Sequence, residues 1–188
     1  MNLVDRVKGI LLRPKEEWPK IAPEAETTQS LYTGYIMILA AIGPVALLLH
    51  SLSLGIVGAI VAYIVALGVT YVMALVVDAL APTFGGEKNF MQSLKLTAYS
   101  YTAVWVAGIL HLIGVLGGLL SLLAALYTLY TFYLGIAVMK KCPQEKAVRY
   151  TIVVVVCGIV LGVIVGGLVM STLFGGATMT GSAMRLYQ

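Results

Sequence analysis

Residues 150–174 read YTIVVVVCGIVLGVIVGGLVMSTLF, a continuous apolar run without one charged side chain. About 20 apolar residues in a helix cross the hydrocarbon layer of a bilayer. Four earlier stretches have the same character, at 31–49, 55–77, 96–115 and 117–139. Only 11% of the chain is charged, against about 25% in a soluble domain. The sequence therefore predicts an all-α membrane protein with five transmembrane helices over 31–174.

The distribution of lysine and arginine predicts the orientation of these spans. One side of the five-span arrangement carries eleven of the twelve basic residues, namely Arg6, Lys8, Arg13, Lys15, Lys20, Lys88, Lys95, Lys140, Lys141, Lys146 and Arg149. The other side has only Arg185, in the tail 175–188. Positive residues remain in the cytoplasm, so we expect a cytoplasmic N-terminus, an external C-terminus and residence in the plasma (inner) membrane. This role accounts for the basic pI without any binding of nucleic acid.

The N-terminal segment, 1–30, precedes the first span and has no apolar core of the kind found in a cleaved signal peptide. Apolar residues repeat at helical spacing over 2–13, with basic residues between them. This pattern predicts a short amphipathic helix in the cytoplasmic headgroup layer, stopped by Pro14, with Trp18 anchoring the turn that follows. A frayed basic tail is the alternative, because such short helices are marginal alone.

Hydroxyl side chains gather at two span ends that the predicted topology brings together on the cytoplasmic side. A short connection, 114–118, would pair the third and fourth spans as a helical hairpin. The candidate lipid or partner site consists of Lys95, Tyr99, Ser100, Tyr101, Tyr127 and Tyr130, with Asp78 from the end of the second span. The four tyrosines would surround a lipid headgroup near Lys95. Alternatively, they form an interfacial tyrosine belt with hydrogen bonds between helices.

Three further features inside the spans have a structural and a functional interpretation. Asp78 lies close to Pro82, so its carboxylate is expected to reach the headgroup water, although an acidic group at membrane depth is also a functional candidate. The packing glycines Gly158, Gly162 and Gly166 share one helix face, which packs either on another helix of the chain or on a second copy. The Gly43-Pro44 pair is expected to kink the first span.

Enzymatic motifs, cofactor-binding loops and metal-ligand spacings are absent from the sequence. Cys142 and Cys157 fall at different depths, which disfavours a disulfide. We therefore expect a non-enzymatic adaptor or membrane organiser without cofactors, which binds lipid headgroups or a protein partner at its cytoplasmic face. A small transporter with a polar cavity between spans two, three and four is the alternative, but no span carries a buried ion pair or acidic relay typical of coupled transport.

Short motifs along nearly the whole chain resemble the prokaryotic branch of the Yip-domain proteins. The Pro-x-x-x-Trp element before the first span is present as Pro14 and Trp18, and the Gly-Pro of that span as Gly43-Pro44. Residues 97–109, TAYSYTAVWVAGI, resemble the Gly-Tyr-Ser-x-x-Pro segment through Tyr99 and Ser100. The LYTLYTFYLG run at 126–135 and the Lys-Ala pair at 146–147 also fit.

The chain also departs from the family pattern at several positions. Ala41 and Ile42 stand where the eukaryotic branch has an acidic residue and an aromatic residue before Gly-Pro. Ala98 and Ala103 replace the glycine and the proline of the second motif. Eukaryotic members are partners of Rab GTPases and have a long cytoplasmic N-terminal region. Because this sequence lacks such a region, we do not carry the Rab-linked role over to it. The resemblance implies a five-span topology and a non-enzymatic membrane role.

Overall fold

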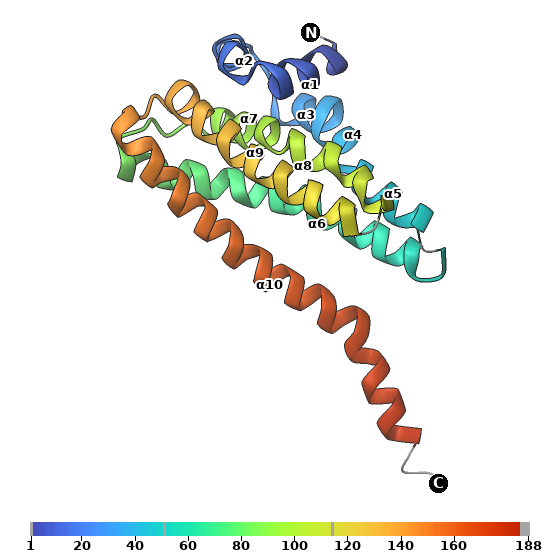
Figure 1. Ribbon diagram of the computed structural model, residues 1–188. Coiled ribbons are helices and arrows are strands. Elements are labelled where there is room, and N and C mark those ends of the chain that lie inside the picture. Colours follow the sequence, from blue (N-terminus) through green and yellow to red (C-terminus); the bar gives the residue numbers. More distant parts are fainter. Residues whose placement is uncertain (1, 51, 114, 185–188) are drawn as a thin grey trace.

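The computed structural model describes residues 2–50, 52–113 and 115–184, which are helical with short connections and contain no strand. Figure 1 shows the helices side by side, except for the last one, which leaves the others along its length. The elements are α1 (Leu3–Leu12), α2 (Pro14–Ile21), α3 (Thr28–Leu31), η1 (Tyr32–Ile36), α4 (Met37–Ala40), α5 (Ile42–His50), α6 (Leu52–Leu80), η2 (Ala81–Phe84), α7 (Phe90–Ser100), α8 (Thr102–Ala107), η3 (Gly108–Ile113), α9 (Val115–Met139) and α10 (Gln144–Met184).

Four helical stretches of the described chain are long and apolar enough to cross a membrane: Thr28–Leu49, Ile56–Phe84, Val115–Met139 and Gln144–Ser171. They correspond to the first, second, fourth and fifth predicted spans. The third predicted span, 96–115, is instead divided among α7, α8 and η3, with a turn at Tyr101. The all-α architecture is confirmed for the described residues, and four of the five predicted spans are long and apolar enough to cross a membrane.

Hydroxyl groups that bind backbone carbonyls three or four residues earlier accompany the break in this segment. Thr97 donates to the carbonyl of Ser93 at 2.9 Å, and Thr102 donates to the carbonyl of Tyr99 at 2.6 Å. Such local hydrogen bonds compete with the helical ladder and bend helices. Further along, a Cβ atom on Gly108 would lie 2.8 Å from the Cα atom of Gly43, so η3 and α5 approach backbone to backbone.

The first span is also a composite of short helices. It begins at a capping box formed by Thr27 and Ser30, continues through the π-helical turn η1, and is interrupted at Ala41. Pro44 has no N–H to donate to the carbonyl of Ala40, which explains the interruption and agrees with the expected kink. The hydrogen bond from Val45 to the carbonyl of Ala41, at 2.9 Å, restores the helix.

The segment α1–α2 covers one end of the helices (Figure 1). The connections after η2 and α9 lie at the same end. Gln92, near the start of α7, donates to the carbonyl of Ala22 after α2 at 2.9 Å, and the amide of Glu87 donates to the carbonyl of Lys140 at 2.8 Å. We call this the basic end. The predicted helix before Pro14 is present as α1, but the predicted turn after it is the helix α2. Pro14 occupies the first turn of α2, where a missing N–H costs nothing.

The last helix, α10, is attached to the bundle mainly near its start. Tyr150 is fully buried, donates a hydrogen bond to the carbonyl of Val77 and stacks on Phe84 at 4.9 Å between ring centroids. From Ile159 to Ser171 most side chains are exposed. The helix continues to Met184, past the predicted end at 174, and the tail residue Arg185 lies outside the described residues.

Candidate functional site

Trp18 fastens the N-terminal helices to the bundle. Its ring is completely buried, and its Nε1 donates to the carbonyl of Thr131 in α9 at 3.1 Å. Gly135, one turn further along α9, makes room for the ring, because a Cβ atom there would lie 2.7 Å from it. The Pro-x-x-x-Trp element and the glycine of the 126–135 run, which are far apart in sequence, are therefore in direct contact.

Arg6 is the centre of an ion-pair cluster beneath α1. Its guanidinium contacts the carboxylate of Glu17 at 2.8 Å, contacts that of Glu24, and lies 5.6 Å from the centre of the Tyr99 ring. Burial alone would lower the pKa of Arg6, but the carboxylates of Glu24 and Glu17 raise it above its ordinary value. Arg6 lies off the apolar face predicted for this helix, yet it is buried against the bundle.

Tyr99 faces this cluster and forms the floor of a small polar cavity. Its hydroxyl donates to the carboxylate of Glu26 at 3.1 Å, and its ring lies 4.6 Å from that of Tyr35 and 6.5 Å from that of Trp18. The cavity has a volume of about 190 Å³. Its walls are Leu3, Arg6, Glu24, Glu26, Ser30, Leu31, Gly34, Tyr35 and Tyr99.

Lys95 does not provide the free cation that the candidate site required. Its ammonium donates to the carbonyl of Ile21 at 3.0 Å and to that of Glu24, and the side chain is 1% exposed. These carbonyls lie at and just beyond the C-terminus of α2, where the helix dipole favours a cation. Lys95 therefore holds α2 in place and is unavailable to a lipid phosphate.

The four candidate tyrosines do not form one cluster. Tyr99 and Tyr101 are two residues apart and so point to opposite sides of their helix. Tyr101 contacts Trp105 at 5.9 Å between ring centroids and lines a second cavity. Tyr127 donates to the carbonyl of Leu11 in α1 at 2.8 Å, and its ring lies 5.8 Å from the half-exposed ring of Tyr130. The expected site is thus divided among three places.

Ser100 belongs to none of these three places. It is 1% exposed, and its hydroxyl has no hydrogen-bond partner within the described part of the chain. It is a packing residue in the contact between helices.

Asp78 is part of a buried network and does not reach water as we expected. Its side chain accepts hydrogen bonds from Lys140 Nζ at 2.9 Å, from Ser93 Oγ at 3.1 Å and from the amide of Asn89 at 2.7 Å. Burial outweighs the attraction of the Asp78 carboxylate and lowers the pKa of Lys140. This ion pair, which the sequence did not suggest, ties the ends of α6, α7 and α9 together.

The packing glycines of α10 have different surroundings. A Cβ atom on Gly158 would meet the side chain of Met73 in α6 at 3.4 Å, so this position packs within the chain. A Cβ atom on Gly162 or Gly166 would meet no atom of the described chain within 4 Å. Packing against another helix of the same chain is therefore found at the first glycine only.

Sequence reasoning missed the acidic partners at the basic end, above all Glu17, Glu24 and Glu26. A signal existed, because these carboxylates occur in a segment that otherwise carries the topology-determining cations. Their alternation with basic residues reads as an exposed, solvated surface. In the structure Glu17 and Glu24 instead pair with the buried Arg6, and Glu26 accepts a hydrogen bond from Tyr99.

The helices, the continuous apolar spans and the folded N-terminal segment define a multi-pass α-helical membrane protein. Residues 8–166 match the family model of the Yip1 domain, and the chain belongs to this family, as the motifs indicated. Proteins of this family are generally non-enzymatic components of membrane trafficking. Searches among curated proteins and among solved structures gave no match.

Proposed function

We propose that the chain crosses the plasma (inner) membrane five times, with its basic end in the cytoplasm. The third crossing is the broken segment α7–α8–η3. This segment begins beside the Asp78–Lys140 pair at the basic end, since the amide of Asn89 donates to Asp78. It ends beside α5, where Gly108 meets Gly43. Because α7–α8–η3 runs the length of the neighbouring helices, we expect it to cross the membrane as they do. With five crossings, every basic segment lies on the same side of the membrane.

We further propose that the protein is a non-enzymatic membrane organiser that docks on anionic lipid headgroups through this end. The supporting observation is a surplus of exposed cations without ion-pair partners in the described chain: Lys8, Lys15, Lys88, Lys146 and Arg149. The exposed carboxylates without such partners are Asp5 and Glu145. Each Lys or Arg near an anionic surface contributes about 1 kcal/mol to its attraction.

The apolar side chains of α1 favour a lipid surface over water. Val4 is 52% exposed and Leu12 is 76% exposed, at opposite ends of the helix. A helix of this kind, with basic residues beside exposed apolar ones, lies in the boundary between headgroups and acyl chains. The docking of α2 through Trp18 and Lys95 holds α1 at that boundary.

The test compares the parent protein with the triple variant Lys8→Gln/Lys15→Gln/Lys88→Gln in mild detergent. We expect added phosphatidylglycerol to raise the unfolding temperature of the parent more than phosphatidylcholine does, and the difference to shrink by more than half in the variant. The difference should also fall at high salt, because exposed charges are screened beyond about 10 Å at 0.1 M.

Lys141→Gln is the matched control, because Lys141 is exposed but already paired with Glu87 at 2.8 Å. It should keep the response of the parent. An equal response of the parent to both lipids would contradict lipid docking and would favour the second candidate, an acidic protein partner at the same surface. The transporter alternative has less support, since the buried cations of the basic end, Arg6, Lys95 and Lys140, already have hydrogen-bond partners within the described chain.

A further inference from the structure

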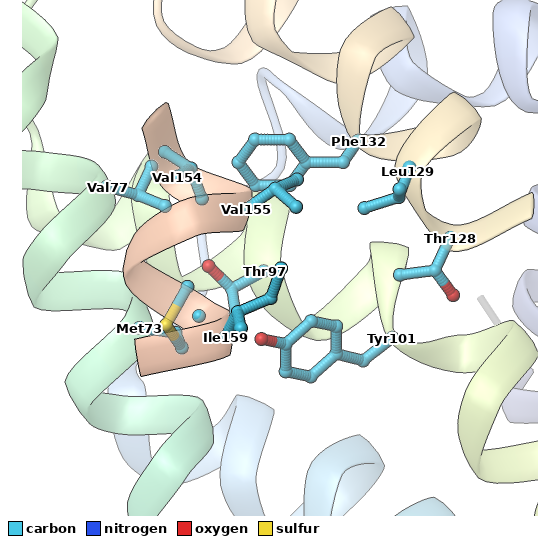
Figure 2. A pocket seen from close by; sticks show the side chains of 11 residues that line it. Met73, Val77, Thr97, Tyr101, Thr128, Leu129, Phe132, Val154, Val155 and Ile159 are labelled. Atoms are coloured by element: carbon cyan, nitrogen blue, oxygen red, sulfur yellow. The ribbon is translucent and has the colours of Figure 1, made fainter. Parts of the chain in front are cut away.

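The polar cavity beside Arg6 and Tyr99 lies at the start of the first span. Its volume of about 190 Å³ is below the range of about 300–1,000 Å³ that is usual for sites of drug-sized ligands, so it suits a group of few atoms. It is separate from the apolar cavity of about 250 Å³ that Figure 2 shows, because Tyr101 lines that cavity from the opposite side of the helix.

The mouth of the polar cavity is at Ser30 and Gly34, which are both exposed. The first candidate span begins at Thr28, so these residues lie in its first two turns, at the level of the headgroups. A Cβ atom on Gly34 would meet no atom of the described chain within 4 Å, so no side chain closes the mouth at this point. A lipid headgroup can therefore reach the cavity from the membrane.

An apolar groove continues from this mouth along the first span. Its walls are Ile38, Ala41, Ile42, Val45, Ala46 and Leu49 of that span, with Ile109 and Leu112 of η3. Ile38 is exposed and lies one turn beyond Gly34 on the same face, so the groove starts where the mouth ends. From Ile38 to Leu49 the helix rises about 16 Å, which is about half of the hydrocarbon layer and thus the depth of one leaflet. The polar cavity and the apolar groove together match one lipid.

Glu26 determines which headgroup the polar cavity attracts. Its carboxylate is half-buried and accepts a hydrogen bond from Tyr99 at 3.1 Å, but it has no ion-pair partner in the described chain. The nearby guanidinium of Arg6 is already paired with Glu17 and Glu24. A carboxylate in this position attracts a cation, and a cation with an N–H donor makes the strongest hydrogen bond to it.

The surroundings of Glu26 favour a primary ammonium over a quaternary one. A quaternary ammonium has no N–H and is recognised by the faces of aromatic rings. Here the guanidinium of Arg6 lies 5.6 Å from the centre of the Tyr99 ring, and the Tyr35 ring packs against the same tyrosine at 4.6 Å. Both rings are thus engaged, which leaves hydrogen bonding to the carboxylate. Lys95 does not provide this bond, because its ammonium donates to backbone carbonyls.

We propose that the cavity and the groove bind one phospholipid with a primary ammonium headgroup, the chemistry of phosphatidylethanolamine. The ammonium donates to Glu26, the phosphate remains at the mouth beside Ser30, and one acyl chain lies in the groove. The lipid lies between α1 and the first span, and it holds the N-terminal helices at the membrane. This site is independent of the proposed docking on anionic headgroups, which uses the exposed cations of the basic end.

The test is native mass spectrometry of the full chain in mild detergent, titrated with phosphatidylethanolamine or phosphatidylcholine of the same acyl chains. We expect the first phosphatidylethanolamine to bind about tenfold more tightly than the first phosphatidylcholine, because only its ammonium donates a hydrogen bond to a charged group. In Glu26→Gln, which keeps an acceptor for Tyr99, this ratio should fall below about threefold. Glu145→Gln is the matched control, because it removes an exposed carboxylate outside the cavity, and it should behave as the parent.

A second variant tests the mouth of the cavity. Gly34→Leu places a side chain across the mouth and should abolish the preference for phosphatidylethanolamine. Gly68→Leu is its control, because Gly68 is exposed in α6 and a Cβ atom there also meets nothing within 4 Å. The triple variant Lys8→Gln/Lys15→Gln/Lys88→Gln should keep the preference, and Glu26→Gln should keep the response to phosphatidylglycerol. The two proposals therefore fail separately.

Equal affinities of the parent for phosphatidylethanolamine and phosphatidylcholine would overturn the proposal, and this comparison needs no variant to fold. A preference that is unchanged in Glu26→Gln would also overturn it. Tight binding of phosphatidylglycerol that Gly34→Leu weakens would show that the cavity holds a phosphate instead of an ammonium, with the same consequence.

Discussion

Gly135 lies so close to Trp18 that even one methyl group at this position has no room. A Cβ atom there would be 2.5 Å from Leu96 Cδ1 and 2.7 Å from the ring of Trp18. Gly135→Ala should therefore lower the unfolding free energy by about 1–3 kcal/mol, the usual cost of overpacking, and expose the segment α1–α2 to protease. Unfolding in detergent and the rate of cleavage within residues 13–20 measure both effects.

Gly118→Ala is the matched control on the same helix, because a Cβ atom on Gly118 meets nothing within 4 Å. Alanine is the better helix former by up to about 1 kcal/mol, so this variant should equal or exceed the parent in stability. Equal losses in both variants would mean that α9 tolerates no substitution of glycine, and the contact with Trp18 would not be the cause.

The Asp78–Lys140 pair has the energetics of a buried ion pair. Lys140 is 0% exposed and Asp78 is 7% exposed. Lys140→Met leaves the Asp78 carboxylate buried without its cation, and should cost about 3–5 kcal/mol of unfolding free energy. Asp78→Leu/Lys140→Met should cost less than the single change, because no isolated charge remains. A denaturant titration of the four members of this cycle gives the coupling energy.

The pair Lys141–Glu87 offers a direct comparison at almost the same place. Its N–O distance is 2.8 Å, but its side chains are 70% and 63% exposed. Lys141→Met should change the stability by no more than about 1 kcal/mol. A loss for Lys140→Met as small as that for Lys141→Met would show that water reaches Asp78.

Among the elements, the broken segment α7–α8–η3 decides the topology. It contains no continuous long helix, and the family membership alone does not fix how often the chain crosses. An epitope inserted after Val115, which is 88% exposed, should be cleaved by protease added outside intact cells. An epitope inserted after Lys141 should be protected. If the segment did not cross, the two epitopes would exchange their behaviour, because α9 would still separate them.

The sequence predicts the class of fold, most of the spans and the helix that precedes them. Apolar runs and the positions of lysines depend only on local composition, so four of the spans and the helix α1 could be recognised. The division at Tyr101 could not, because it depends on the hydroxyl of Thr102 finding the carbonyl of Tyr99. Conversion of the expected turn after Pro14 into α2 depends on docking of Trp18.

The candidate site was predicted in its residue types but not in its arrangement. Hydroxyls of α7 and α9 do lie near one another, as Thr97, Tyr101 and Thr128 around one cavity. Tyr99 instead faces the opposite way, and Lys95 is used by the C-terminus of α2. Which face a side chain occupies follows from helix phase, but which neighbour covers that face follows from tertiary packing. The folded N-terminal segment was the missing neighbour.

The glycine face of the last helix packs either against another helix of the same chain or against a second chain, and a substitution at Gly162 distinguishes the two. Gly162 lines a groove between α10 and α6 in which a Cβ atom would have free space. Gly162→Leu should therefore leave the unfolding temperature in detergent unchanged within error, whereas close intramolecular packing would make it fall. The same sample, cross-linked in membranes, tests the possible homo-oligomer through this helix. Loss of a cross-linked dimer at unchanged stability would identify a second chain as the partner of Gly162, and a clear loss of stability would instead show that α10 closes onto α6 in the bilayer.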